Sequence, residues 1–142
     1  MSQFKHLSPA YVDLMTALHQ QCFDAPWTKD DFLSLLSLPT TKGLINETGM
    51  IICSVCGEDA EILTLCVLPQ HRKKGIATKM IEQMGRYIKK FQVVSLILEV
   101  NVNNTAALKL YEKCGFNKIG MRKDYYKTPA GRQDALVLQK KL

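Results

Sequence analysis

Residues 65–78 read Leu-Cys-Val-Leu-Pro-Gln-His-Arg-Lys-Lys-Gly-Ile-Ala-Thr and lead from an apolar strand through a basic loop into a helix. The strand is predicted over residues 60–68, where Pro69 ends it, and the helix over residues 75–90. Backbone N–H groups at the start of a helix lack partners within it and carry partial positive charge. Gly75 lets the backbone approach an anion, and the basic residues before it add charge. The stretch therefore predicts either an anion site or only a helix that begins at a glycine behind a basic cap.

Short helices and strands alternate on both sides of this stretch. Before it we expect helices over 9–21 and 28–38, the second opened by a capping box, and strands over 42–46 and 50–56. After it we expect a strand over 93–100, a helix from Asn104 or Thr105 to Cys114, and strands over 116–122 and 135–139 joined by a polar loop. The strand–helix–strand unit implies a parallel pair with a right-handed crossover. We predict a mixed α+β sheet with helices on its faces, in a single domain spanning residues 1–142.

The composition is that of an ordinary globular protein, with 46% hydrophobic and 23% charged residues among 142. No apolar run approaches the roughly 20 residues of a membrane-spanning helix, and the start lacks the apolar segment of a secretory signal. Five cysteines, an odd number, predict a reduced, cytoplasmic protein. The CxxC pattern at Cys53 and Cys56 lies within an apolar strand and predicts two buried cysteines without a metal site.

Charge is divided unevenly along the chain. Up to Pro69 there are 3 basic and 8 acidic residues, and from Gln70 onward there are 16 basic and 5 acidic residues. The basic half favours an anionic ligand, either nucleic acid or a phosphorylated cofactor, although an unevenly charged solvated surface would look the same. The glycine patterns of a P-loop and of a Rossmann turn are absent. The acidic half could attract a cationic second ligand through Asp24, Asp30, Asp31, Glu58, Asp59 and Glu61.

Two residues after the basic loop are candidates for acid–base chemistry. Glu99 lies near the end of an aliphatic strand, where it is either a solvated strand-end charge or a carboxylate suited to accept a proton. Tyr111 lies within the following helix, where it either packs in the core or donates a proton to a developing thiolate. The residue types alone leave both alternatives open.

Several motifs together resemble a known enzyme family. Arg72-Lys73-Lys74-Gly75-Ile76-Ala77 resembles the Gln/Arg-x-x-Gly-x-Gly/Ala motif of the GCN5-related N-acetyltransferase (GNAT) superfamily. The segments 98–100, 103–107 and 110–116 resemble the second half of that superfamily. The segments 122–126 and 131–135 narrow the resemblance to the bacterial ribosomal-protein alanine N-acetyltransferases of the RimI type, and the segment 25–28 resembles their acceptor-side loop. This resemblance implies a mostly antiparallel mixed sheet whose central parallel strand pair is splayed to hold acetyl-CoA, flanked by the predicted helices.

The resemblance also implies roles for individual positions. Glu99 matches the general base, Tyr111 the general acid and Asn104 a cofactor-contacting asparagine. The backbone of Leu65, Cys66 and Val67 matches the strand that binds the pantetheine arm. The pyrophosphate loop is matched by Arg72, Lys73, Lys74, Gly75, Ile76, Ala77 and Thr78. The acceptor side is matched by Trp27, Tyr125 and Tyr126, and no metal is implied.

The expected function is acetyl-CoA-dependent acetylation of a protein N-terminal α-amine, with a ribosomal protein that begins with alanine as the acceptor implied by resemblance. The neutral amine would attack the thioester directly, without a covalent enzyme intermediate. One alternative is acetylation of a lysine side chain or a small-molecule amine, because only the acceptor cleft would differ. A second alternative, a basic RNA- or ribosome-binding module, lacks a recognisable RNA motif. We expect neither direct nucleic-acid binding nor membrane association.

Overall fold

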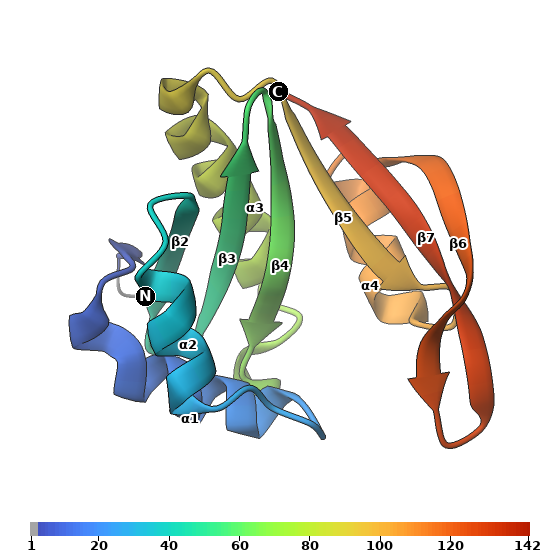
Figure 1. Cartoon of the computed structure of the whole chain (residues 1–142), viewed down its shortest axis with the longest axis horizontal. Coiled ribbons are helices and arrows are strands. Elements are labelled where there is room, and N and C mark those ends of the chain that lie inside the picture. The colour runs from blue at the N-terminus through green and yellow to red at the C-terminus, as the bar shows by residue number, and fades with distance from the viewer. Residues whose placement is uncertain (1–2) are drawn as a thin grey trace.

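The computed structural model describes residues 3–142 and contains one mixed sheet, as predicted. The strand order is β1-β2-β3-β4-β5-β7-β6, and all neighbours are antiparallel except β4 and β5 (Figure 1). The strand bounds are β1 Lys5–His6, β2 Thr41–Asn46, β3 Gly49–Cys56, β4 Asp59–Val67, β5 Ser95–Asn101, β6 Asn117–Thr128 and β7 Gly131–Lys141. The predicted mixed fold, mostly antiparallel with one central parallel pair, is confirmed.

The parallel strands β4 and β5 separate partway along their length. They pair only from Asp59 with Ser95 to Glu61 with Ile97, after which both strands continue without pairing to each other. A β-bulge accompanies the separation, because Thr64 pairs with Ile52 while Ile62 pairs with Cys53, which leaves Leu63 as the extra residue of β4. Figure 1 shows the two strands diverging from the top of the view. The predicted splay is therefore present, and it leaves one side of the second half of β4 without a strand partner.

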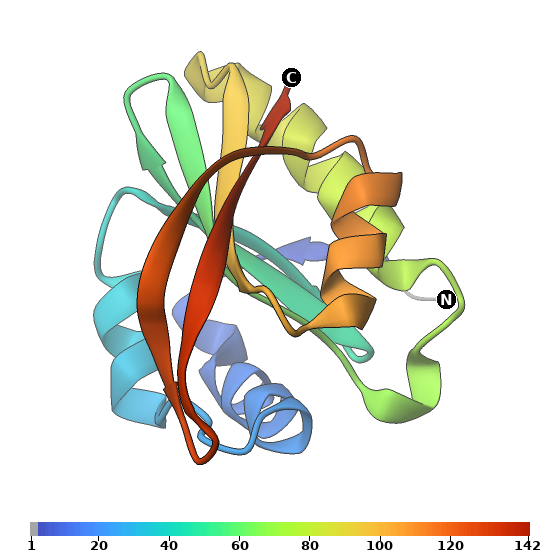
Figure 2. The same cartoon turned by 90° about the vertical axis from the view of Figure 1, so that its right-hand side faces the viewer.

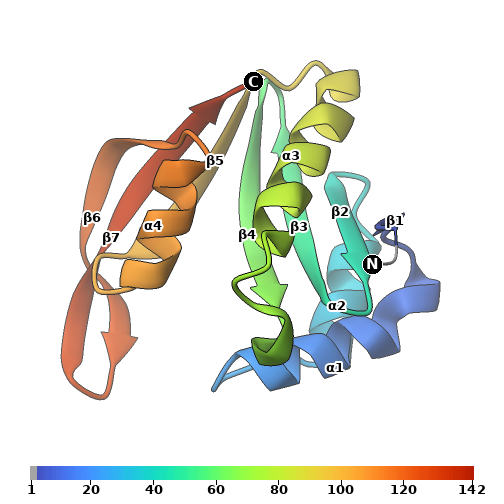
Figure 3. The same ribbon diagram turned by 180° about the vertical axis from the view of Figure 1, so that it is seen from behind.

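Helices cover both faces of the sheet and form two apolar cores. The helix bounds are α1 Val12–Cys22, α2 Lys29–Leu36, α3 Ile76–Ile88 and α4 Thr105–Lys113, with short 3-10 turns at Pro9–Tyr11, Pro69–His71 and Lys89–Phe91. Figure 3 shows α3 and α4 on the face opposite to α1 and α2. Met80, Ile81 and Met84 of α3 anchor one core, and Met15 and Phe32 anchor the other.

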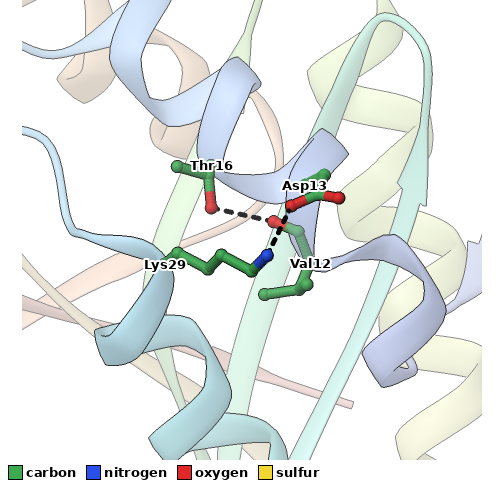
Figure 4. A network of polar contacts seen from close by, with 4 residues as sticks. All are labelled: Val12, Asp13, Thr16 and Lys29. Carbon is green, nitrogen blue, oxygen red and sulfur yellow. Dashed lines mark hydrogen bonds and ion pairs between the residues drawn. The ribbon is translucent and has the colours of Figure 1, made fainter.

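A capping box begins α2, as the sequence predicts. The Thr28 side chain accepts the Asp31 backbone N–H at 3.1 Å, and the Asp31 carboxylate accepts the Thr28 N–H at 2.8 Å. An exposed ion pair between Lys29 and Asp13, 3.1 Å long, links α2 to α1 (Figure 4). On α1 itself, the Thr16 hydroxyl donates to the Val12 carbonyl at 2.8 Å.

Two local predictions are wrong. The polar loop expected between the last strands is instead a long hairpin, in which Tyr126 pairs with Gln133 and Thr128 with Gly131. Exposed strands of a hairpin can be as polar as a loop, so composition alone does not distinguish the two structures. Cys53 is buried as expected, but Cys56 is exposed because it ends β3 beside the turn. Figure 2 shows the tip of the hairpin at the same end of the molecule as α1 and α2.

Candidate active site

The basic loop ends in a left-handed glycine at the start of α3. Gly75 is the N-cap of α3 with φ +78°, and Lys73 has φ +62°. A Cβ atom on Gly75 would meet nothing within 4 Å, so the backbone conformation, rather than lack of space, favours glycine here. Lys73 and Lys74 are exposed beside the first turn of α3. This loop thus presents a helix N-terminus and two free-standing cationic side chains at the end of β4, where an anion would be stabilised.

Other predicted cofactor residues lie around this loop. Leu65, Cys66 and Val67 occupy the part of β4 that has left β5. Ile76, Ala77 and Thr78 form the first turn of α3. The Arg72 Nε donates to the Val67 carbonyl at 2.9 Å, and Asn104 caps α4 by accepting the Ala107 N–H at 3.2 Å. Arg72 and Asn104 therefore also have structural partners, which hold the loop against β4 and begin α4.

A cavity of about 820 Å³ collects the predicted acceptor-side residues. Trp27, Glu99, Tyr125 and Tyr126 all line it, although they come from the segment after α1, from β5 and from β6. The acidic first half of the chain contributes further carboxylates to the wall. The remaining lining residues are Asp31, Ser34, Leu35, Ser37, Leu38, Glu61, Ile62 and Leu63. The cavity combines an apolar wall with negative charge, which suits a ligand that carries an amine.

Glu99 is held at the boundary of this cavity by two partners. Its side chain is only 16% exposed, and its Oε1 lies 3.0 Å from the Arg122 Nε. A hydrogen bond from Tyr125 to the Glu99 carboxylate is the main cause that raises the pKa of Tyr125. Burial, followed by the charge of Glu99, raises the pKa of Tyr126. Both tyrosine hydroxyls therefore stay protonated and able to donate at neutral pH.

Tyr111 lies in the core and lines neither this cavity nor a second one of about 410 Å³ that shares Glu61, Glu99 and Tyr125. Its ring contacts Phe116 edge-on at 5.4 Å. Burial, with smaller contributions from Cys114, Tyr126 and Cys53, raises the pKa of Tyr111 to about 12. The phenol therefore stays protonated at any physiological pH and has a proton that it can donate.

Arg122 and His19 have no predicted role, yet both contact proposed site residues. Arg122 pairs with Glu99, and the His19 Nδ1 accepts the Trp27 backbone N–H at 3.0 Å. Neither contact leaves a signal in the sequence, because no motif or periodicity links residues on separate elements.

In residues 3–142 no group of three or more His, Cys, Asp or Glu side chains could hold a metal ion. None of the helices described here is both long and apolar enough to cross a membrane.

The chain is similar in sequence to a known family of enzymes. The model of the acetyltransferase (GNAT) family matches residues 12–116. The [ribosomal protein bS18]-alanine N-acetyltransferase of Escherichia coli is 30% identical over 132 residues, which cover 89% of each chain. The relative of the same name from Haemophilus influenzae is 34% identical and covers 97% of each chain.

Solved structures show the same fold. The crystal structure of the ribosomal-protein-S18-alanine N-acetyltransferase from Escherichia coli superposes with a TM-score of 0.89 at 26% identity, covering 99% of this chain and 94% of that one. Arabidopsis thaliana NAA60 in complex with acetyl-CoA shares the fold at 17% identity, with a TM-score of 0.86 and coverage of 99% and 98%. Given the family match over most of its length, the chain belongs to the GNAT acetyltransferase family and is an acyltransferase.

Proposed function

We propose that the protein transfers the acetyl group of acetyl-CoA to the N-terminal α-amine of a protein, and that its natural acceptor is the N-terminal alanine of ribosomal protein bS18. The observation that carries this proposal is the cavity in which Glu99, Trp27 and the Tyr125–Tyr126 pair meet. The names of the relatives at 30% and 34% identity support the choice of acceptor. A ribosomal acceptor would place the reaction in the cytoplasm.

The splayed strands and the basic loop fit acetyl-CoA. Beyond Glu61 the edge of β4 that faces β5 has no strand partner, so the backbone at Leu65–Val67 can bind the amides of a pantetheine arm. The first turn of α3, with Lys73 and Lys74, would bind the pyrophosphate. When bound, acetyl-CoA supplies a thioester carbonyl as the electrophile.

The chain's own residues would then move two protons. A free α-amine has a pKa of about 7.7–8.0, so much of it is charged and not nucleophilic at neutral pH. Glu99 accepts its proton through a water molecule, and the neutral amine attacks the carbonyl. As the carbon–nitrogen bond forms and the carbon–sulfur bond breaks, the nitrogen releases its second proton to solvent and Tyr111 donates a proton to the leaving thiolate. Tyr111 then regains a proton from solvent and Glu99 releases one, so that each cycle yields the amide, the CoA thiol and one net proton. Each acid–base step contributes roughly 10²–10⁴-fold to the rate.

A panel of acceptors tests this function. Acetyl-CoA is offered with peptides that differ only in their first residue, with an N-terminally blocked peptide that contains lysine, with free lysine and with polyamines. Product masses and fragment spectra locate the acetyl group. We expect α-acetylation of the peptide that begins with alanine. Acetylation confined to ε-amines or to small amines would overturn the proposed acceptor.

A variant separates binding from chemistry. Glu99→Gln should bind CoA normally in calorimetry, because Glu99 lies in the acceptor cavity rather than at the basic loop. Its kcat should fall by roughly 10²-fold or more. A full kcat across the pH range would show that Glu99 is not the base.

A further inference from the structure

The segment between α1 and α2 contains Trp27 but no regular secondary structure. Residues 23–28 join the end of α1 to the N-cap of α2, and Trp27 projects into the wall of the acceptor cavity. At one end of this segment Phe23 donates to the His19 carbonyl at 3.1 Å. At the other end the Thr28 N–H is held by Asp31. The Trp27 N–H between them is satisfied by a side chain, the imidazole of His19.

His19 is buried and has a partner on each ring nitrogen. It is only 3% exposed, its Nδ1 accepts the Trp27 N–H at 3.0 Å, and its Nε2 lies 3.2 Å from the Thr64 hydroxyl. A backbone N–H can only donate, so Nδ1 carries no proton and the ring proton is on Nε2, which donates to Thr64. The imidazole is therefore neutral, and burial lowers the pKa of His19, which favours this state.

Aromatic rings complete the surroundings of the imidazole. The Trp27 ring stacks on it, with centroids 4.8 Å apart and an angle of 23°, and the rings of Phe23 and Phe32 lie at 4.3 and 5.4 Å. One side chain thus fixes both the backbone and the ring of Trp27. Its other partner, Thr64, lies in β4 next to the bulge, in the part of the strand that has left β5.

A polar side-chain contact between α1 and α2 on the surface is weaker than the buried one. The Lys29–Asp13 pair is 55% and 85% exposed, so solvent screens it (Figure 4). The buried imidazole is consequently a polar contact, protected from solvent, that connects the acceptor-side segment to the strand beside the proposed acetyl-CoA site.

We propose that His19 is a positioning residue, which holds Trp27 as the wall of the acceptor cavity and ties that wall to β4 through Thr64. The proposal rests on the proposed function, because it takes this cavity as the site of the acceptor. It predicts that loss of the Nδ1 acceptor weakens acceptor binding while the basic loop before α3 still binds acetyl-CoA.

Two substitutions at the same position separate the ring nitrogens. His19→Asn places an amide oxygen near the Nδ1 position and can still accept the Trp27 N–H. His19→Gln places its polar group near the Nε2 position and leaves that N–H without an acceptor. We expect His19→Gln to raise the acceptor KM roughly tenfold with the acetyl-CoA KM within twofold, and His19→Asn to restore much of the loss.

Trp27 is the single tryptophan of the chain, so its fluorescence reports on the same contact without any turnover. We expect a red-shifted emission and stronger acrylamide quenching in His19→Gln, and a spectrum close to that of the wild type in His19→Asn. Thr16→Val is the matched control, because the Thr16 hydroxyl bonds only within α1, to Val12 (Figure 4). This control should change neither the emission nor the acceptor KM.

A second variant keeps the test decisive if His19→Gln does not fold. Thr64→Val removes the Nε2 partner and should raise the acceptor KM and the acrylamide quenching, but by less than His19→Gln does. Thr64→Ser keeps the hydroxyl and should leave both quantities unchanged. Unchanged emission and unchanged acceptor KM in the folded His19 and Thr64 variants would overturn the proposal. If no peptide is acetylated at all, the proposed function fails, and the fluorescence still decides whether His19 positions Trp27.

Discussion

The Arg122 Nε lies 3.0 Å from the Glu99 Oε1, although the two residues belong to strands that are not neighbours in the sheet. The strand β7 lies between them, so the arginine on β6 reaches across β7 to the carboxylate on β5. The guanidinium also lies over the Tyr125 ring, 5.3 Å from its centroid. Arg122 thereby links the proposed base to the acceptor-side hairpin.

Arg122→Gln should therefore reduce catalysis more than stability. The Arg122 side chain is 58% exposed, and such ion pairs contribute about 0–1 kcal/mol to folding. Release of the Glu99 carboxylate from its oriented position should lower kcat roughly tenfold, because small displacements of a catalytic group are costly. Steady-state kinetics and urea unfolding measure the two effects. Arg122→Lys, which keeps the charge without the planar fork, should be intermediate, and an unchanged kcat in Arg122→Gln would contradict the orienting role.

Tyr111→Phe should lower kcat by roughly 10²-fold or more while CoA binding persists, because only the proton donor is removed. The pKa of Tyr111, raised to about 12, gives an independent check by ultraviolet titration. Phenolate absorbance should rise late in the wild type, and the variant should lack the latest component. Above pH 10 the unfolded chain ionises this tyrosine before the folded one does, so the wild type should lose stability as the pH rises further. Loss of CoA binding in the variant would instead point to a packing role.

Gly75→Ala should weaken CoA binding through backbone strain alone. A left-handed conformation costs a residue with a Cβ atom about 1–2 kcal/mol, and no neighbouring atom would clash with the new methyl group. Calorimetry should show a CoA affinity reduced several-fold, with partial recovery in Gly75→Asn, because asparagine tolerates this conformation. Gly57→Ala is the matched control, since Gly57 has φ +62° and equally open surroundings in the β3–β4 turn. Equal losses of CoA affinity at both glycines would contradict a role specific to the basic loop.

Stability should decrease as the pH falls through about 6.5, and His19 should account for part of this decrease. Burial lowers the pKa of His19 below 6.5 in the folded state. As the pH falls, the unfolded chain therefore binds the proton first, and this binding stabilises the unfolded state relative to the folded one. Above this range the imidazole is neutral in both states and contributes no pH dependence, and below the folded-state pKa the loss is complete. Urea unfolding at a series of pH values measures the slope. His19→Gln should flatten it; a slope identical to that of the wild type would refute the assignment.

Several features can be predicted from the sequence because they depend on residues that are close together in the chain. The reciprocal bonds of Thr28 and Asp31 require only four consecutive residues and a polar side chain at each end. Gly75 was identifiable for a similar reason, since a strand, a basic loop and a helix follow each other without interruption. Hydrophobic periodicity likewise located α3, whose buried face includes Met80 and Met84.

Features that depend on strand register could not be predicted from the sequence. The sequence predicts a loop for part of the hairpin over residues 117–141, because the polar half of its exposed strands shows no apolar alternation. The sequence predicts a buried Cys56, but the turn at Gly57 places it at the end of β3 in solvent. The bulge at Leu63 exists only as a difference in pairing between β3 and β4.

The sequence by itself determined the order of the helices and strands, the capped helix starts and the basic, glycine-ended loop before α3, since each depends on residues close together in the chain. Only the tertiary structure decided which side chains share the cavity. His19 meets Thr64 across 45 residues, and Arg122 meets Glu99 across an intervening strand. Such contacts are fixed by the register of the sheet and by the packing of helices on it, and a linear pattern carries no record of either.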